Sequence, residues 1–195
     1  MKTQKFNPMK AAVKTSLLLM VVMVATIASC QTKGTADKGG KKVSAPQVDI
    51  HTAIVTDNVE ALKQHIAAGS DINEKDPFGG SSPLISASLF GKTEMAKILI
   101  DAGADINFQN NDGSTALHTS SFFCNPEIVR MLLTKGADKS IRNKFGSTAY
   151  ESVAGAFAEV KPVYEMMQKM LGPSGLKMDF AYIQKTRPEI ASMLK

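Results

Sequence analysis

The chain has 195 residues and a formal net charge of +5, with two cysteines and no tryptophan. This length suits one domain with appended segments. Four of the excess positive charges come from lysines in the segment 1–29, which holds no acidic residue. The rest of the chain is therefore close to neutral, and its charge gives no reason to expect a nucleic-acid partner.

The segment 1–29 has the organisation of a secretory signal peptide. Four lysines flank the start of the apolar run LLLMVVMVATIA, Leu17 to Ala28. This run suits the hydrophobic part of a signal peptide and is too short to cross a bilayer core of about 30 Å. The run ends in IASC, which resembles the lipobox of bacterial lipoproteins and implies cleavage after Ser29 and lipidation of Cys30. An ordinary signal peptide with a chance cysteine is the alternative.

Residues 30–47 are predicted to form a lipidated cysteine followed by a flexible tether. The stretch QTKGTADKGGKKVSAPQ is polar and rich in glycine and lysine, without apolar periodicity. With Cys30 lipidated, Cys124 has no cysteine partner within the chain. The resemblance to lipoproteins implies a membrane anchor in a bacterial cell envelope, periplasmic or surface-exposed, with the outer membrane favoured.

From residue 48 onward the sequence repeats itself with a fixed period. Ser82, Thr115 and Thr148 are 33 apart, and so are Gly103 and Gly136. Repeats of this length indicate stacked supersecondary units that share one continuous core.

The repeated stretches resemble the ankyrin repeat. They read GSSPLISASLFGKTEMAKILIDAGADIN over 80–107 and GSTALHTSSFFCNPEIVRMLLTKGAD over 113–138. The resemblance covers about residues 49–171 and implies an all-α repeat solenoid of helix–turn–helix units with short β-hairpin or loop fingers. About four repeats are expected, followed by a degenerate helical cap. The predicted ranges are 48–76, 77–110, 111–143 and 144–171 for the repeats and 172–195 for the cap.

Local signals support paired helices in each unit. A first apolar helix is expected around Leu84–Phe90 and around Leu117–Phe123, and a second helix follows with apolar residues at helical spacing. Asn125, Pro126 and Glu127 form a favourable helix start, with Asn as N-cap, Pro at the first position and an acid in the first turn. Gly103 and Gly136 stand where a helix ends in a left-handed residue.

The units at the two ends depart from the pattern. The first repeat lacks a preceding finger, and the DPFGG stretch at 76–80 has one residue more than the pattern. In the fourth repeat, Pro162 is expected to start the second helix. In the tail, Pro188–Ile190 echoes Pro126–Ile128, which favours a fifth, degraded helix pair that closes the stack. A detached amphipathic helix is the alternative.

The stretch HTSSFFCNPE, His118 to Glu127, contains residue types that hydrolases use. The resemblance instead implies that His118 and His51 tie a finger to a helix through hydrogen bonds, and that Cys124 occupies the glycine position between two helices. A hydrolase that depends on Cys124 or Ser121 is a competing hypothesis from another functional class. The three histidines lack metal-ligand spacing, and we expect no metal, no cofactor and no small-molecule substrate.

The resemblance also implies a partner-binding surface, built from the fingers and from the ends of the first helices. The predicted finger residues are Phe78, Ser81, Asn111, Asp112, Ser114, Lys144 and Phe145. The predicted helix-end residues are Leu89, Phe90, Phe122 and Phe123. The phenylalanines among them would form an aromatic strip, and packing between repeats is the alternative.

These observations predict a non-catalytic, membrane-tethered protein that binds another protein in the bacterial cell envelope. The alternative is a dedicated inhibitor, immunity factor or protective partner of a single periplasmic enzyme or toxin.

Overall fold

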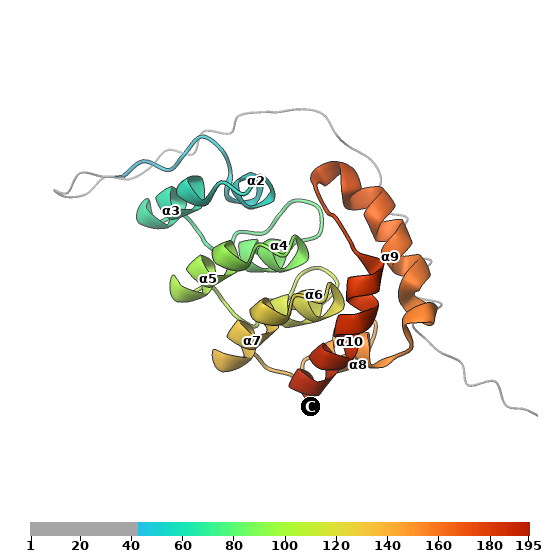
Figure 1. Cartoon of the computed structure of the whole chain (residues 1–195). Helices are drawn as coiled ribbons and strands as arrows, with labels where there is room; N and C mark the ends of the chain where they lie inside the picture. Colours follow the sequence, from blue (N-terminus) through green and yellow to red (C-terminus); the bar gives the residue numbers. More distant parts are fainter. Residues whose placement is uncertain (1–42) are drawn as a thin grey trace, which may run out of the picture. The chain divides into compact units, whose positions relative to one another are not determined.

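Short antiparallel helices stack one pair upon another along residues 43–195, the part of the chain that the computed structural model describes (Figure 1). The predicted signal peptide, the predicted lipidation site Cys30 and most of the predicted tether lie outside these residues. Residues 43–49 have no helix, and no strand occurs between residues 43 and 195. The fingers are therefore loops and not β-hairpins, and the predicted helical repeat solenoid is confirmed.

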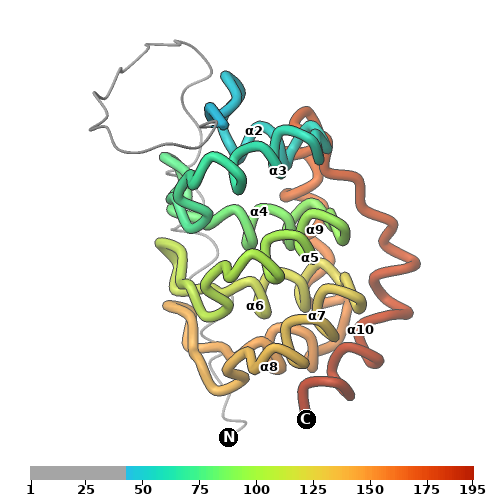
Figure 2. The backbone as a smooth tube through the Cα atoms, turned by 90° about the vertical axis from the view of Figure 1, so that its left-hand side faces the viewer, coloured from blue at the N-terminus to red at the C-terminus, as the bar shows by residue number. Residues whose placement is uncertain are grey.

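The helices pair in chain order for the first three units. The pairs are α2 (Ile50–Val55) with α3 (Val59–Ala67), α4 (Pro83–Leu89) with α5 (Thr93–Asp101), and α6 (Ala116–Phe122) with α7 (Pro126–Thr134). α8 (Ala149–Ala154), α9 (Phe157–Leu171), the 3-10 turn η2 (Gly172–Ser174) and α10 (Phe180–Leu194) follow. Figure 2 shows the finger loops projecting together from one edge of the stack.

The first helices α4, α6 and α8 each begin at a hydroxyl side chain that caps them, and α2 begins at the capping carboxylate of Asp49. Ser82, Thr115 and Thr148 accept hydrogen bonds from backbone N–H groups at the third helical position. This satisfies donors that a helix start otherwise leaves unpaired. Asn125 is the N-cap of α7 as predicted, but its side chain donates to the Ser88 carbonyl of the preceding unit at 2.8 Å.

Left-handed residues end the helices at the predicted positions. Gly103 and Gly136 have φ of +87° and +82°. The turn between the two helices of a unit is also left-handed, and it uses Asp57, Gly91 and Cys124 in the first three units, with φ of 60°, 64° and 57°. The prediction that Cys124 occupies a glycine position is therefore confirmed.

The fourth unit differs from the expected arrangement. α9 begins at Phe157 and not at Pro162, because the apolar spacing Phe157, Val160 and Tyr164 starts before the proline and buries Val160 and Tyr164. Pro162 is accommodated inside the helix, where it cannot donate to the carbonyl four residues earlier.

α10 is the second helix of the fourth unit. It packs on α8 and α7 in the way that α7 packs on α6 and α5. Its PEIASML stretch at 188–194 aligns with PEIVRML at 126–132, and Ile190 is fully buried like Ile128. The tail is therefore not a fifth helix pair, since α10 is one continuous helix through Pro188. α9 and η2 are an insertion between the two helices of the fourth unit.

The main hydrophobic core runs through the stack and repeats the same positions from unit to unit. Met95 and Leu99 of α5 are fully buried, and so are Ile128 and Leu132, which stand one repeat period later in α7. α8 contributes to this core and α10 extends it with Ile190 and Leu194. The core residues and those packed against it include none from α9.

Candidate protein-interaction surface

Three finger loops precede α4, α6 and α8, and a side chain at the base of each loop holds it in shape. Asn110 Oδ1 accepts from the N–H of Asp112 and Ser114, and Asn143 Oδ1 accepts from Phe145 and Ser147. Such side-chain turns fix a loop without a strand. In the first finger Asp76 serves the same role.

The first finger is altered as its extra residue predicted. The N–H of Asp76 donates across the loop to the carbonyl of Ser81, five residues later. In the second finger, the corresponding bond from Asn110 reaches Ser114, four residues later. Gly80 has φ of +64°, and a Cβ at this position would lie 2.4 Å from Asn111 Oδ1. A residue with a Cβ at this position would have to displace the Asn111 side chain and would adopt a strained left-handed backbone, and glycine avoids both.

Hydrogen bonds join each finger to the next, so the fingers form one row. The N–H of Asn111 donates to the Gly79 carbonyl at 2.9 Å, and the N–H of Lys144 donates to the Asp112 carbonyl at 2.8 Å. Histidines tie the same loops to the helices as predicted. His118 Nε2 donates to the Ser147 carbonyl at 3.1 Å, and His51 Nε2 to the Glu74 carbonyl at 3.0 Å.

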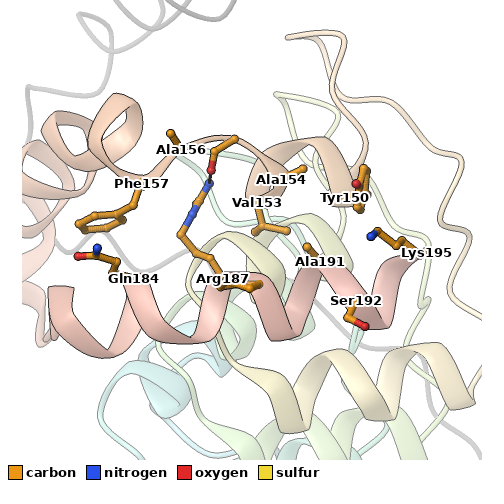
Figure 3. A pocket seen from close by; sticks show the side chains of 12 residues that line it. Tyr150, Val153, Ala154, Ala156, Phe157, Gln184, Arg187, Ala191, Ser192 and Lys195 are labelled. Carbon is orange, nitrogen blue, oxygen red and sulfur yellow. Dashed lines mark hydrogen bonds between the residues drawn. The ribbon is translucent and has the colours of Figure 1, made fainter.

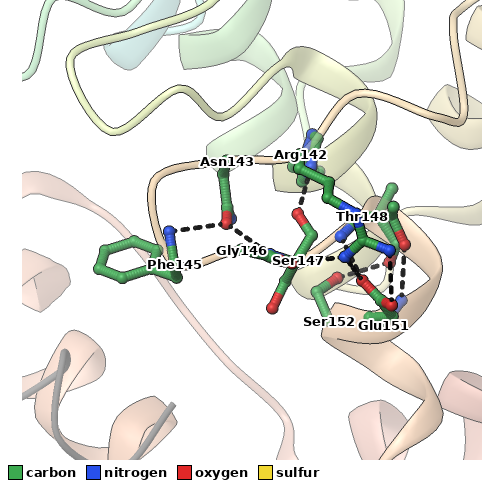
Figure 4. A network of polar contacts seen from close by, with 10 residues as sticks. Arg142, Asn143, Phe145, Gly146, Ser147, Thr148, Glu151 and Ser152 are labelled. Atoms are coloured by element: carbon green, nitrogen blue, oxygen red, sulfur yellow. Dashed lines mark hydrogen bonds and ion pairs between the residues drawn. The ribbon is translucent and has the colours of Figure 1, made fainter. Parts of the chain in front are cut away.

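We call the seven predicted finger residues the fingertip row. Phe78 is its most exposed large apolar side chain, with 73% of its surface accessible, and Asn111 and Lys144 are also exposed. Ser81, Asp112, Ser114 and Phe145 are half-buried. The Phe145 ring points away from a polar network in which Arg142 pairs with Glu151 (Figure 4). An exposed phenylalanine on a rigid loop is a ready-made contact for a partner.

The four predicted helix-end residues, which we call the helix-end row, are all half-buried. They are Leu89, Phe90, Phe122 and Phe123. The Phe122 ring meets Phe123 edge-on, with centroids 5.3 Å apart, and stacks on Tyr164 of α9 at 4.5 Å. The phenylalanines therefore do not form one open strip, because α9 contacts the row at Phe122.

Tyr164 and Arg187 were not singled out from the sequence, yet they join α9 and α10 to the stack. The Tyr164 hydroxyl donates to the Phe122 carbonyl at 2.6 Å, and Arg187 Nη1 donates to that hydroxyl at 2.9 Å. Burial raises the pKa of Tyr164. The sequence pattern does predict that Arg187 is buried, because this residue occupies an apolar position in the helical spacing of Ile183, Ile190 and Leu194.

Arg187 is 3% exposed and completes the C-terminal end of α8. Its guanidinium donates to the carbonyls of Gly155 at 3.1 Å and Ser152 at 3.4 Å. Figure 3 shows Arg187 reaching from α10 toward the chain that follows α8. These acceptors lie where a helix leaves carbonyls unpaired and its dipole is negative. The arginine also lines an open hollow of about 470 Å³ between α8, the start of α9, and α10.

The residues with hydrolase-like chemistry are held in structural roles. Cys124 is 1% exposed, and burial raises the pKa of its thiol to about 11, so little thiolate exists at neutral pH. Both nitrogens of His118 are engaged, by Ser147 and Thr115, and burial lowers its pKa. Ser121 Oγ is buried and has no hydrogen-bond partner. His118 is therefore not free to activate a neighbouring nucleophile.

Two further observations concern residues 43–195 only. They hold no group of three or more His, Cys, Asp or Glu side chains arranged to bind a metal ion. In the same segment, no helix combines the length and the apolar character that crossing a membrane requires.

Comparison with known proteins agrees with this geometry. Residues 50–143 match the protein family described as Ankyrin repeats (3 copies). The chain is 36% identical over 64 residues to protein phosphatase 1 regulatory subunit 27 of Homo sapiens, covering 33% of this chain and 41% of that protein. It is 34% identical over 71 residues to the Homo sapiens DNA-binding protein RFXANK, covering 34% and 27%.

Among solved structures, the fold is similar to the ankyrin repeat domain of Bcl-3, a member of the IkappaB protein family. The TM-score is 0.51 at 34% sequence identity, covering 53% of this chain and 45% of that chain. This chain spans less than half the length of each of these relatives, so the likeness concerns the repeats.

Proposed function

Because residues 50–143 are ankyrin repeats, we propose that this chain is a non-catalytic protein-interaction module, held at a membrane of a bacterial cell envelope by a lipid on Cys30. The observation that carries the interaction role is the fingertip row. Its backbone is fixed by finger-to-finger hydrogen bonds, and Phe78 stands 73% exposed at its first finger.

A rigid loop with an exposed aromatic ring favours binding for a physical reason. An aromatic side chain brings a large contact area and loses little conformational entropy when it is immobilised. The fingers are already ordered, so a partner does not have to order them on binding. We expect a partner pocket that accepts the Phe78 ring, with polar contacts to Asn111 and Lys144 around it.

The membrane tether rests on the sequence. The IASC stretch ending at Cys30 resembles a lipobox, and the polar residues that follow supply a linker of roughly 20–25 Å average reach. The part of the predicted tether from Cys30 to Lys42 holds four lysines and one aspartate, whereas residues 43–195 hold 15 basic and 17 acidic residues. The basic tether would favour an anionic membrane surface, and the near-neutral repeats would remain free for a protein partner.

Site-specific photo-crosslinking in intact envelopes tests the interaction role. A photo-reactive residue replaces Phe78 in the lipidated chain, and the matched control carries it at the exposed Glu94 on α5. We expect position 78 to capture one dominant protein and position 94 not to capture it. Equal capture at both positions would argue against the fingertip row as the binding surface.

The same substitution at two exposed aromatic residues provides the test and its control. In a pull-down of the dominant partner without the photo-reactive residue, Phe78→Ser should lower the yield at least tenfold, whereas Tyr182→Ser on α10, where the side chain is 47% exposed, should leave it unchanged. For the tether, Cys30→Ala should move the chain from the membrane fraction to the soluble fraction. A Cys30→Ala chain that stays with the membrane would contradict the lipid anchor.

A further inference from the structure

α9 stands outside the repeat pattern and lies on one side of the stack. Figure 1 shows the second helices α3, α5 and α7 on one side, the first helices in the middle and α9 on the opposite side. Figure 2, turned by 90°, places α9 behind the stack. The helix therefore lies on the first-helix side, to which the helix-end row belongs.

The attachment of α9 to the stack is narrow. Val160 and Tyr164 are its only fully buried residues, and both lie in its first eight positions. Phe157 is half-buried and stacks on Tyr164 with centroids 5.9 Å apart. Among residues 165–171, none is fully buried, and Gln168 Oε1 is enclosed without a hydrogen-bond partner. Few buried apolar contacts and an unsatisfied polar atom are marks of a segment with low local stability.

Glycines lie on both sides of α9, and they permit changes of backbone conformation there. Gly155 lies at the end of α8, immediately before the helix, and Gly172 and Gly175 follow it. Pro162 removes one backbone hydrogen bond from inside α9. α8 and α10 carry the fourth unit without α9, because their apolar residues enter the main core and those of α9 do not.

The contact between α9 and the helix-end row requires a tyrosine, because it uses both an aromatic ring and a hydroxyl. The ring of Tyr164 stacks on Phe122 at 4.5 Å, and its hydroxyl donates to the carbonyl of the same residue at 2.6 Å. This carbonyl lies in the last turn of α6, where a helix leaves acceptors free. The row thus presents an apolar ring and an acceptor side by side, and a tyrosine satisfies both.

We propose that α9 is an internal stand-in for a partner helix, and that a partner displaces it by offering an amphipathic helix with the same contacts. The apolar spacing of α9 describes the ligand: an apolar residue, as at Phe157, a second one three positions later, as at Val160, and a tyrosine four positions after that, which makes the contact with Phe122. Such a helix lays its apolar side against the row as short helical ligands do in other proteins. This inference rests on the proposed interaction function and adds the kind of partner.

Hydrogen exchange provides the first test, on residues 30–195 with Cys30→Ser so that the chain stays in solution. Amides of α9 should exchange by local opening, at least a hundredfold faster than amides of α6, while α10 keeps the protection of α6. Equal protection of α9 and α6 would overturn the proposal.

The second test supplies α9 in trans. The probe is a labelled synthetic peptide of residues 156–172, and the receptor carries Phe157→Ala and Tyr164→Ala, which release its own α9. The peptide should bind this receptor at least tenfold more tightly than the receptor with both residues intact, and Phe122→Ala in the receptor should abolish binding. A peptide with Tyr164→Ala is the matched control and should not bind.

Circular dichroism and urea unfolding of the released receptor must first show that its helical stack remains folded. If the folded receptor does not bind the peptide at 1 mM, the row is not a helix-binding surface and the inference fails. The Phe78 crosslinking experiment is independent of α9, so its success beside a failed peptide experiment would leave the interaction function standing.

Discussion

Repeats two and three and the segment from α8 to α10 belong to one stack but are held together differently. In the two regular repeats the same positions are buried once in every period, and the polar groups tie loops to helices. After α8 the chain inserts α9 and returns to the pattern only in α10. There a buried arginine and a tyrosine, and not apolar side chains alone, bridge three helices.

The difference shows which properties of a repeat unit are essential to the stack. The second helix of the fourth unit is separated from its first helix by the whole α9 insertion, yet Ile190 and Leu194 occupy the positions of Ile128 and Leu132. The stack therefore requires apolar side chains at fixed places and not a fixed connection between them. A unit that keeps those places can carry an insertion with its own function.

The largest expected effect compares equivalent leucines in the two regions. Leu132→Ala should lower the free energy of unfolding by about 3 kcal/mol, because its side chain is fully buried between two neighbouring units. Leu194→Ala should cost about 2 kcal/mol, since it closes the last unit. The half-buried Leu171 of α9 is the control, and Leu171→Ala should cost less than about 1 kcal/mol.

Urea unfolding of the three variants measures these differences. A cost at Leu194 as small as that at Leu171 would show that α10 is an appendage and not the fourth second helix.

The next effect concerns the arginine that joins the C-terminal helices. Arg187→Met should lower the free energy of unfolding by about 2 kcal/mol, because the buried Tyr164 hydroxyl and the partly buried carbonyls of Ser152 and Gly155 lose their donor. The exposed Arg130 of α7 is the matched control, and Arg130→Met should change stability by less than about 0.5 kcal/mol. An Arg187→Met chain with unchanged stability would mean that water replaces the guanidinium at no cost.

A smaller effect is the pH dependence of stability that His118 gives to the third unit. Burial lowers the pKa of His118, so the unfolded chain, with a histidine pKa near 6.5, binds the proton more readily than the folded chain. The contribution of His118 to stability is therefore complete above about pH 6.5 and declines as the pH falls through the folded-state pKa.

The free energy of unfolding should thus decrease between pH 7 and pH 5, and His118→Gln should flatten that decrease. The corresponding position in the fourth unit is Glu151, which makes the same capping contacts through a carboxylate. An unchanged pH dependence in His118→Gln would assign the decrease to other groups.

The sequence predicts the structure of the regular repeats in more detail than that of the segment after α8, and the reasons are physical. The left-handed positions, the role of His118 and the wider first finger each follow from local spacing, because neighbouring units repeat the same contacts. The place of α9 does not follow from its amphipathic pattern. That pattern indicates that one side of the helix is buried, but it does not identify the surface that covers it. Likewise, the local sequence around Phe122 does not distinguish a ring that is open to a partner from a ring that stacks on Tyr164. Only the fold brings those two residues together from 42 positions apart.

The smallest expected effect tests the turn between the helices of the third unit. Cys124 has φ of 57°, a left-handed conformation that costs a side-chain-bearing residue about 1–2 kcal/mol. Its thiol is buried 3.7 Å from the Ile183 carbonyl of α10, and this burial stabilises the fold by a similar free energy. Cys124→Gly should therefore change the free energy of unfolding by less than about 1 kcal/mol, because it removes both contributions.

Cys124→Ala separates the two contributions, since it keeps the strained backbone and loses the sulfur. The alanine variant should be less stable than the glycine variant by about 1 kcal/mol, which reverses the usual order of these residues near helices. Urea unfolding of the pair measures the difference directly. If alanine were the more stable, the strain at residue 124 would be negligible, and the thiol contact with α10 would alone account for a cysteine at a turn where the second unit has Gly91.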